Sequence, residues 1–547
     1  MQVAEAVGRA LARRGPSHVF GLIGSGNFAV TNALVAEGAR FIAARHEGAA
    51  ISMTDAYAQV TGQIGMCSVH QGPGLTNTMT GLTEAAKSRT PLVLLAGDTA
   101  AAAIRSNFRI DQDQLVTSVG ALAERIHSPQ TAVADALRAL HRARVERKPV
   151  VLMLPLDVQA SDCPNPDPFF ADPPVLRPTR PSAEAVVDAA DALRRAERPL
   201  IIAGRGARNT GAQLETLGEM LGALLATSAV GNGLFASSEW SLGISGGFAS
   251  STAAELVQQA DVILGVGASL NMWTTRHGKL LSPAGTVIQI DHDPDALGAH
   301  HRVDVALVGD VLESVNALLT ELGKRETSRS GWRTPDIAQR IADGTWQSTP
   351  FDDASTPDRI DPRALSKALN ELLPLERNVA IDSGHFMGYP AMYLRVPDEH
   401  AFVFTQSFQA VGLGLGSAIG TAVARPDRVT VAALGDGGAM LSLPEFETVA
   451  RLGLRMLIVI YNDSAYGAEV HHFGPHGHPL DLVRFPEVDF AGLARGAGLR
   501  GETVRTVKDL HVVSEWIASG STPAMVLDAK VVPTVVAEWL EEAFRGH

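Results

Sequence analysis

The stretch VAALGDGGAMLSLPEFETVARLGLRMLIVIYNDSAYGAE, residues 431–469, contains two apolar runs that each end in polar residues. The first run ends at the Gly-Asp-Gly triplet 435–437, and 24 residues separate this triplet from Asn462, which ends the second run. Such runs predict buried parallel strands with a helix between them. Because the carboxyl ends of parallel strands meet at one sheet edge, where ligands bind, we expect Asp436 and Asn462 to lie close together.

The residue types at these two strand ends suit a magnesium ion. Asp436 offers a carboxylate and Asn462 a carboxamide, and Mg²⁺ prefers such oxygen ligands together with carbonyl and phosphate oxygens. Residues 442–445, Ser-Leu-Pro-Glu, predict a capping box at the start of the intervening helix, and a helix N-terminus attracts anions. Either strand end alone is also typical of an ordinary turn or helix cap. The two together favour a site for a metal ion and a diphosphate.

Apolar runs alternate with helical stretches along the whole chain, which is the pattern of parallel sheets covered by helices. Pro-, Asp- and Ser-rich segments at 161–182 and 323–362 interrupt this pattern and predict linkers. We therefore predict three doubly wound α/β domains, at residues 1–165, 183–325 and 360–547.

Composition excludes several classes of function. The net charge of −13, with no basic stripe to offset it, argues against a nucleic-acid partner. No apolar run reaches the ~18 residues of a membrane span, and no signal peptide is evident, so we expect no membrane partner. Only Cys67 and Cys163 occur, which favours a reducing cytoplasm.

The triplet at 435–437, the spacing to Asn462 and the pattern along nearly the whole chain resemble the thiamine diphosphate enzymes. The resemblance is greatest to the branch of acetolactate synthases and 2-oxo acid decarboxylases, including benzoylformate decarboxylase. It implies thiamine diphosphate and Mg²⁺ as cofactors, with the metal held by Asp436, Asn462 and the carbonyl of Ser464. Tyr461 departs from the family, which often has Asn there. The implied diphosphate contacts are Gly384, His385, Gly435, Gly437 and Gly438.

Glu47 lies in ARHEGAA, residues 44–50, at the start of an apolar helix. There a carboxylate can simply pair with the helix dipole. The resemblance instead implies the glutamate that hydrogen-bonds N1′ of the aminopyrimidine ring. It also implies that Val411, in SFQAVGLGLGSAIG at 407–420, separates the two cofactor rings, and that the main chain at Gln409 and Val411 bonds the pyrimidine. Further pyrimidine contacts would be Pro73, Gly74 and Asn77.

Four further residues are candidates for acid–base or substrate-binding roles by the same resemblance: Ser25, His70, Gln112 and Glu469. A histidine can donate or accept a proton near neutral pH, and His70 follows a predicted strand beside a glycine turn. Ser25 and Gln112 lie in loops of a composition that needs no function. His471 and His472 are expected on the polar face of an exposed helix.

The resemblance implies an enzyme that acts on a small 2-oxo acid by acetolactate-synthase-like decarboxylation and carboligation. The alternative is a non-oxidative 2-oxo acid decarboxylase or C–C lyase that releases an aldehyde. In relatives the cofactor lies between subunits, with Glu47 from one and Asp436 from the other, which implies a homodimer or homotetramer.

Two other classes stay open. The glycine turn in IIAGRGARNTG, residues 201–211, is typical of a dinucleotide fold and would suit a flavin- or nicotinamide-dependent oxidoreductase. FAD is possible but not favoured, because residues 265–278 lack the Arg-Phe-Asp-Asp-Arg run of flavin-binding relatives. A non-catalytic homologue that only binds the cofactor or a partner is the third possibility.

Overall fold

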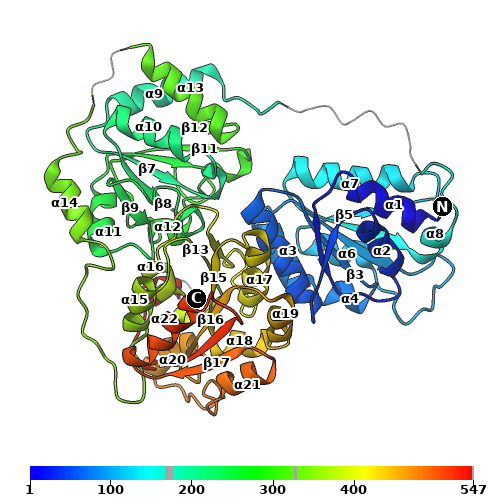
Figure 1. Ribbon diagram of the computed structural model, residues 1–547. Helices are drawn as coiled ribbons and strands as arrows, with labels where there is room; N and C mark the ends of the chain where they lie inside the picture. The colour runs from blue at the N-terminus through cyan, green and yellow to red at the C-terminus, as the bar shows by residue number, and fades with distance from the viewer. Residues whose placement is uncertain (167–176, 326–328, 545–547) are drawn as a thin grey trace.

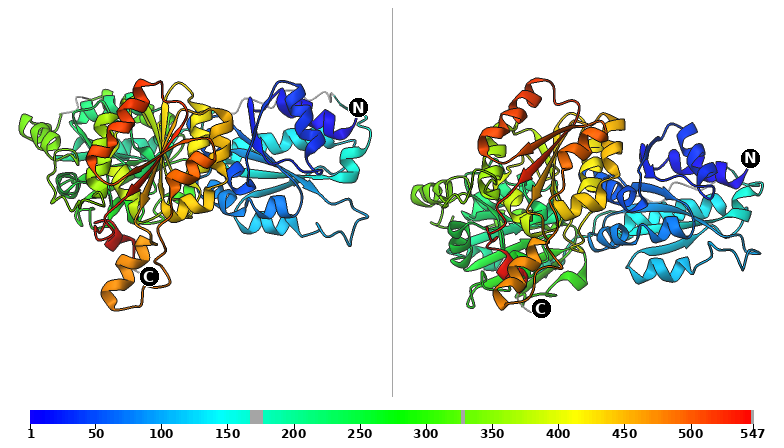
Figure 2. Two further views of the ribbon diagram at one scale, coloured as in Figure 1. Left: turned by 60° about the horizontal axis from the view of Figure 1, so that its bottom comes forward. Right: turned by 90° about the horizontal axis from the view of Figure 1, so that it is seen from below.

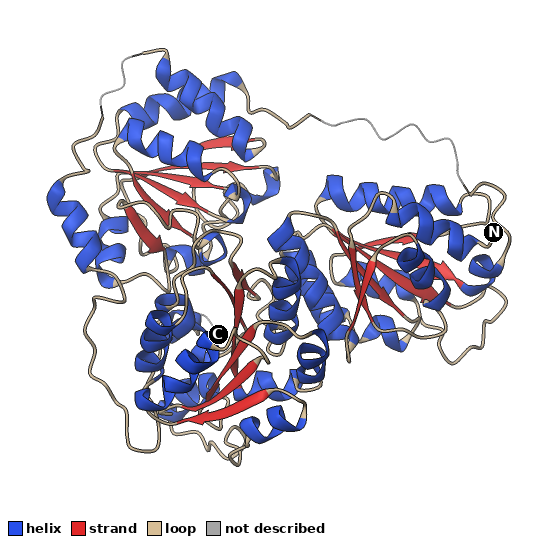
Figure 3. Cartoon of the chain, viewed as in Figure 1, coloured by secondary structure: helices blue, strands red, loops and turns tan. Residues whose placement is uncertain are grey.

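The computed structural model describes residues 1–166, 177–325 and 329–544. Figure 1 shows three α/β units along the chain, and Figure 3 shows that each has a sheet with helices on both faces. The expected linkers at 161–182 and 323–362 lie partly outside the described residues. The second linker also contains a helix, α14 (Pro335–Asp343).

Each unit contains one six-stranded parallel sheet, which confirms the predicted fold class. In spatial order the first sheet has β2 (Arg40–Ala43), β1 (His18–Gly21), β3 (Gly65–Val69), β4 (Leu92–Asp98), β6 (Pro149–Pro155) and β5 (Leu122–Arg125). The middle sheet has β12 (Val305–Val308), β11 (Thr286–Asp291), β10 (Val262–Val266), β7 (Pro199–Ala203), β8 (Leu224–Thr227) and β9 (Ser241–Ile244). The third has β14 (Phe402–Phe404), β13 (Arg377–Ile381), β15 (Val429–Gly435), β16 (Met456–Asn462), β18 (Met525–Lys530) and β17 (Arg500–Val504).

The first and third domains share one strand order. Numbered within each domain, both run second, first, third, fourth, sixth, fifth. The middle domain instead places its first strand, β7, beside its fourth, β10, which is the order of dinucleotide-binding folds. Equivalent elements of the two outer domains can therefore be compared directly.

Helices cover both faces of each sheet. The first domain contributes α1 (Val3–Ala12), α2 (Phe28–Ala36), α3 (Glu47–Thr61), α4 (Pro73–Thr76), α5 (Met79–Lys87), α6 (Gln112–Ser118), α7 (Ala132–Glu146) and α8 (Leu156–Ala160). The middle domain contributes α9 (Ala183–Arg194), α10 (Gly211–Leu221), α11 (Ser251–Gln258), α12 (Met272–Thr275) and α13 (Val311–Gly323). The third contributes α15 (Pro362–Leu372), α16 (Gly388–Tyr393), α17 (Gly414–Ala424), α18 (Asp436–Ser442), α19 (Glu445–Leu452), α20 (Gly467–Phe473), α21 (Phe490–Gly496), α22 (His511–Ala518) and α23 (Leu540–Ala543).

Helices α3 and α17 join the first domain to the third (Figures 1 and 2). Each follows the second strand of its own domain, so the two helices are equivalent. The contact depends on glycine, because a Cβ added at Gly420 would lie 2.1 Å from the carbonyl oxygen of Met53. At Gly416 the same atom would lie 3.0 Å from the carbonyl oxygen of Ala49. The two backbones approach as closely as they do only because these side chains are missing.

Two features of the structure bear on the predicted reducing compartment and on the membrane spans that the sequence was searched for. Both cysteines are buried free thiols. In the part of the chain that the structure describes, no helix has the length and apolar character needed to cross a bilayer.

Gly420→Ala should separate α3 from α17. Alanine normally favours a helix interior over glycine, but here the added methyl group meets a fixed carbonyl, and overpacking of this kind costs about 1–3 kcal/mol. Thermal unfolding should begin at a lower temperature than in the wild type. Gly323→Ala, at the exposed end of α13 where no atom lies within 4 Å of the new Cβ, is the control and should not lower it. Equal midpoints for the two variants would contradict the role given to this contact.

Candidate active site

The carboxyl edge of the third sheet brings together the polar residues of the opening stretch. Strand β15 pairs in parallel with β16, and Gly435 is opposite Tyr461. The next residue on each strand is Asp436 and Asn462, so the two lie side by side at the sheet edge. Helix α18 begins at Asp436 itself.

The side chain of Asn462 is buried and its orientation is fixed on both sides. Its Nδ2 donates to Asp528 Oδ1 at 2.9 Å, and its Oδ1 accepts from the main-chain N–H of Ser464 at 3.2 Å. Ser464 has a left-handed backbone, with φ of 60°, which turns the chain sharply after the strand. The Ser464 carbonyl accepts from Phe485 N at 2.8 Å, and a carbonyl has a second lone pair available for another partner.

The chemistry of this donor set fits magnesium. Burial raises the pKa of Asp436 to about 6, and burial together with the charge of Asp436 raises the pKa of Asp463 to about 7. A divalent cation beside these carboxylates would stabilise their charged forms. Among the described residues no group of three or more His, Cys, Asp or Glu side chains is arranged as a metal site. A metal here would need amide and main-chain oxygens as well, which is typical of Mg²⁺.

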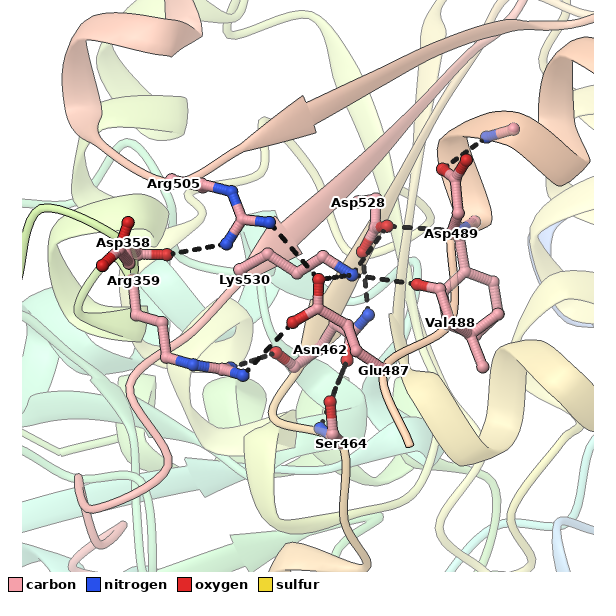
Figure 4. A network of polar contacts seen from close by, with 12 residues as sticks. Asp358, Arg359, Asn462, Ser464, Glu487, Val488, Asp489, Arg505, Asp528 and Lys530 are labelled. Atoms are coloured by element: carbon pink, nitrogen blue, oxygen red, sulfur yellow. Dashed lines mark hydrogen bonds and ion pairs between the residues drawn. The ribbon is translucent and has the colours of Figure 1, made fainter. Parts of the chain in front are cut away.

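Figure 4 shows the network of polar residues around Asn462, which includes Asp528 and Lys530. Lys530 is 2% exposed, and its Nζ lies 3.0 Å from Asp528 Oδ2 and 3.2 Å from Glu487 Oε1. It also donates to the carbonyl of Val488 at 2.9 Å. The buried ammonium balances the carboxylate of Asp528, and this carboxylate in turn holds the Asn462 amide with its oxygen toward Ser464.

The predicted capping box at 442–445 is wrong. The hydroxyl of Ser442 donates to the carbonyl of Gly438 at 2.9 Å, inside α18. The carboxylate of Glu445 accepts from the main-chain N–H groups of Arg45 and His46, at 2.9 and 3.0 Å, and from the hydroxyl of Thr448 at 2.6 Å, but not from the main chain at Ser442. Burial raises the pKa of Glu445. A partner 400 residues away in sequence outcompetes the local cap because it offers two donors to a buried acid.

Two glycines of the predicted diphosphate set are required by close packing or backbone geometry. A Cβ at Gly438 would lie 2.2 Å from Asp382 Oδ2, and Gly384 has φ of 143°, which L-residues rarely adopt. Asp382 itself is fully buried, and burial raises its pKa to about 6. It accepts hydrogen bonds from the N–H groups of Gly412 and Gly414, at 2.9 and 3.2 Å for the closest oxygens.

His385 is buried against the C-terminal segment. Its Nε2 accepts from the main-chain N–H of Ala537 at 2.9 Å, so in the neutral ring the proton sits on Nδ1. Burial, reinforced by His471, lowers the pKa of His385 to about 3, and the ring stays neutral at working pH. The expected exposure of His471 and His472 is wrong. The ring of His471 lies 4.4 Å from that of His385, and His472 stacks on Phe544 at 4.0 Å.

The predicted pyrimidine segment forms an open turn between β14 and α17. Gln409 has φ of 61° and an exposed side chain, and Val411 is 43% exposed. The hydroxyl of Ser383 donates to the Gln409 carbonyl at 3.3 Å. The main chain of the turn is thus bonded to Ser383, while the side chain of Val411 stays accessible to solvent.

Four of the first-domain candidates lie together at its sheet edge. Glu47 is the first residue of α3 and is 8% exposed. Its Oε2 accepts from Nδ2 of Asn77 at 2.9 Å, and a Cβ added at Gly74 would lie 3.7 Å from its Oε1. Pro73 begins the adjacent helix α4.

His70 follows β3 and is close to Ser25, with 3.3 Å between Nε2 and Oγ. Its Nδ1 lies 2.8 Å from the carbonyl oxygen of Gln71. Gln112 is buried and uses both ends of its amide on the main chain. Its Oε1 accepts from Gly72 N at 3.0 Å and its Nε2 donates to the Gly97 carbonyl at 3.1 Å. The Gln112 side chain therefore links the glycine turn at Gly72 to the end of β4 at Gly97.

The candidate residues form two separate groups within the chain. Glu469 lies half-buried on α20 in the third domain, and its side chain makes no hydrogen bond or ion pair with the described residues. Across residues 1–166, 177–325 and 329–544, no hydrogen bond or ion pair links Glu47 or His70 to Asp436 or Asn462.

Sequence reasoning missed the residues that support the site. Asp382 lies in IDSGHF, residues 381–386, two residues before Gly384, and its position after an apolar strand was the available signal. Lys530 follows the last strand's apolar run, where a buried lysine is rare enough to indicate a partner. The main-chain partners of Glu445, Arg45 and His46, lie in another domain, and nothing local in the sequence indicates them.

Comparison with known proteins agrees with this geometry. The chain matches a thiamine pyrophosphate enzyme's N-terminal TPP binding domain over residues 1–118, its central domain over 186–318 and its C-terminal TPP binding domain over 382–527. It is 26% identical to pyruvate oxidase of Lactiplantibacillus plantarum, over 93% of this chain and 85% of that protein. It is 28% identical to a probable 2-ketoarginine decarboxylase of Pseudomonas aeruginosa, over 95% of this chain and 92% of that protein. It is also 28% identical to the acetolactate synthase large subunit of Parasynechococcus marenigrum, over 96% and 86%.

The chain therefore belongs to the family of thiamine pyrophosphate enzymes, which confirms the resemblance in the sequence. Within that family it stands in the branch that contains acetolactate synthases and 2-oxo acid decarboxylases.

Lys530→Met should destabilise the third domain strongly. It leaves the carboxylate of Asp528 buried without its cation, and breaking a buried ion pair on one side costs about 3–5 kcal/mol. Chemical denaturation should show this loss, and the double variant Lys530→Met with Asp528→Asn should recover part of it. Arg505→Met, which removes a more exposed partner of Glu487, is the control and should cost less than about 1 kcal/mol. Equal effects of the two single variants would contradict the network in Figure 4.

Proposed function

We propose that this enzyme uses thiamine diphosphate and Mg²⁺ to decarboxylate a small 2-oxo acid and to join the remaining fragment to a second carbonyl compound, as in acetolactate synthesis. The observation that carries the proposal is the oxygen set at the ends of β15 and β16. The similarity to an acetolactate synthase over almost the whole chain supports it.

The third domain would hold the charged end of the cofactor. Asp436, Asn462 and the Ser464 carbonyl are proposed as the magnesium ligands. Gly384, Gly435, Gly437 and Gly438 would let the diphosphate approach the main chain, and His385 would donate from Nδ1. The bound cofactor supplies the nucleophilic carbon and the electron sink for loss of CO₂.

The first domain would bind and tune the aminopyrimidine. Glu47 would share a proton with N1′, and its bond to Asn77 holds one carboxylate oxygen while the other faces Gly74. Pro73 and Gly74 would pack on the ring. From the third domain, the main chain at Gln409 and Val411 would bond its edge, with the Val411 side chain keeping the two rings folded.

Ser25, His70, Gln112 and Glu469 are proposed to act around the substrate. The contact between Ser25 Oγ and His70 Nε2 suits a pair that binds a carboxylate and transfers a proton. Gln112 would act through the turn at Gly72. Glu469 would reach the reacting carbon from α20.

Two copies of the chain are proposed to complete each site, in a homodimer or homotetramer. Large apolar side chains are exposed on both outer domains, among them Phe28 (56%), Ile104 (68%), Leu441 (69%) and Leu482 (88%), and a second subunit would cover such surface. The two free thiols support a cytoplasmic location. We also propose the domain limits 1–165, 183–325 and 360–547.

A simple decarboxylase that releases an aldehyde is the second candidate. The Ser25–His70 contact and the similarity to a probable 2-ketoarginine decarboxylase favour it. FAD remains disfavoured. At the switch point of the middle sheet, the glycine turn after β7 packs directly on the turn after β10, with Gly206 N bonded to the Gly267 carbonyl at 3.0 Å. This contact joins the two turns at the sheet position where dinucleotides bind in such folds.

With thiamine diphosphate and Mg²⁺, the purified protein should consume a 2-oxo acid. Pyruvate and an aromatic 2-oxo acid are incubated separately, and the products are identified by mass spectrometry. Acetolactate or acetoin would support carboligation, whereas free aldehyde would support the second candidate. Absence of measurable affinity for the cofactor and metal would overturn the whole proposal.

Glu47→Gln should bind thiamine diphosphate within a few-fold of the wild type but turn over about 10²–10⁴-fold more slowly, the range of a general acid–base contribution. Binding and turnover are measured on the same preparation. Glu5→Gln changes an exposed side chain in the first turn of α1. It is the control and should leave both cofactor binding and turnover unchanged. Undiminished turnover in the Glu47 variant would instead support a protein in which the cofactor is not used catalytically.

A further inference from the structure

Two buried glutamates connect the outer domains in a reciprocal way. Glu84 of the first domain accepts from the main-chain N–H groups of Ser407 and Phe408, at 3.0 and 2.6 Å. Glu445 of the third domain accepts from Arg45 and His46 in the first. The side chains of both glutamates lie almost entirely out of contact with solvent, with Glu84 at 2% and Glu445 at 1% exposure.

The two contacts occupy equivalent places in the two domains. Glu84 lies on α5 and Glu445 on α19, and each of these helices comes between the third and fourth strands of its sheet. The turns that they bind come directly before α3 and α17, the helices in contact in Figure 1. Each outer domain therefore provides one carboxylate that binds the turn before helix α3 or α17 of the other outer domain.

Each turn carries a group proposed to face the cofactor. Arg45 and His46 directly precede Glu47, and Ser407 and Phe408 directly precede Gln409. A carboxylate can only accept hydrogen bonds, so it fixes where these N–H groups point. Bonds between N–H donors and a buried charged acceptor are among the stronger ones in proteins.

The middle domain reinforces one of the two turns. Arg205, in the glycine turn after β7, donates to the carbonyl of Ser88 at 2.6 Å and to Oγ of Ser407 at 3.4 Å. The hydroxyl of Ser88 bonds both Glu84 Oε1, at 3.2 Å, and Ser407 Oγ, at 2.8 Å. The glycine turn that suggested a dinucleotide site in the sequence thus braces the segment at Ser407.

We propose that Glu84 and Glu445 are positioning residues for the two halves of the cofactor site. Glu84 sets the main chain at Gln409 and Val411, and Glu445 sets the start of α3, from which Glu47 projects. We call the contacts of Glu84 with Ser407 and Phe408, and those of Glu445 with Arg45 and His46, the two clamps. Because two copies of the chain are proposed to share each site, the two clamps of one chain help to form different sites. The inference rests on the proposed function for what the turns bind, but the clamps themselves can be tested without cofactor.

Hydrogen–deuterium exchange of the full-length protein tests each clamp locally. Glu84→Gln replaces one acceptor oxygen with a donor, and the amides of Ser407 and Phe408 should exchange roughly tenfold faster or more. The segment at 44–50 should keep its wild-type rate. Glu445→Gln should give the reverse pattern. Ser88→Ala, a milder change beside Glu84, should accelerate exchange at Ser407 and Phe408 to a smaller extent.

Glu447→Gln is the matched control. Glu447 lies on the same helix as Glu445 and bonds Arg45 at 2.6 Å, but through the arginine side chain and at the surface. Glu447→Gln should leave the rate of amide exchange unchanged both at Ser407 and Phe408 and in the segment at 44–50. Wild-type exchange in the Glu84 and Glu445 variants, or an equal rise in both segments, would overturn the proposal.

Cofactor titration separates this inference from the proposed function. Glu84→Gln should weaken thiamine diphosphate binding about tenfold, whereas Glu445→Gln should leave affinity near the wild-type value and lower kcat about tenfold. If the wild type binds no cofactor, the proposed function fails while the exchange result still decides on the clamps. If the wild type binds and both variants match it in affinity and kcat, the positioning role fails alone.

Discussion

The close crossing of α3 and α17 is the contact on which the arrangement of the outer domains depends. Two glycines on α17 let the helix backbones meet, and the helices begin at the turns that carry Glu47 and Val411. A helix is rigid over this length, so the position of one turn is set by the packing of the other. The geometry of both half-sites is therefore set by helix packing inside the protein core.

Buried carboxylates repeat the same task around this core. Asp382, Glu84 and Glu445 each accept main-chain N–H groups from a turn at the end of a strand. Asp528 does the equivalent for the amide of Asn462. Turns cannot satisfy all their own backbone donors, and an acid that supplies two acceptor oxygens satisfies several at once. The protein thus uses charge in its interior to shape the chain, and only Asp528 among these four has a buried lysine beside it.

Much of the fold could be predicted because its central strands are continuous apolar runs, as in β4, β6 and β16, which are buried along their whole length. Short or half-exposed edge strands such as β5, β9 and β12 carry no such signal. The positions of Asp436 and Asn462 followed from strand ends alone. The capping box failed because Glu445 bonds the main chain of another domain, and Glu84 gave no signal because its main-chain partners are 323 and 324 residues away. Local patterns find the edge of a sheet but do not identify what another domain brings to it.

The shared strand order of the outer domains has a consequence for their origin. Duplication of one ancestral sheet domain gives this organisation in a single event, with the middle domain inserted between the copies. The residue directly after the third strand is His70 in the first copy and Asp436 in the third. Divergence at one inherited position would thus give one copy the group proposed to exchange protons and the other the proposed oxygen ligand of the metal.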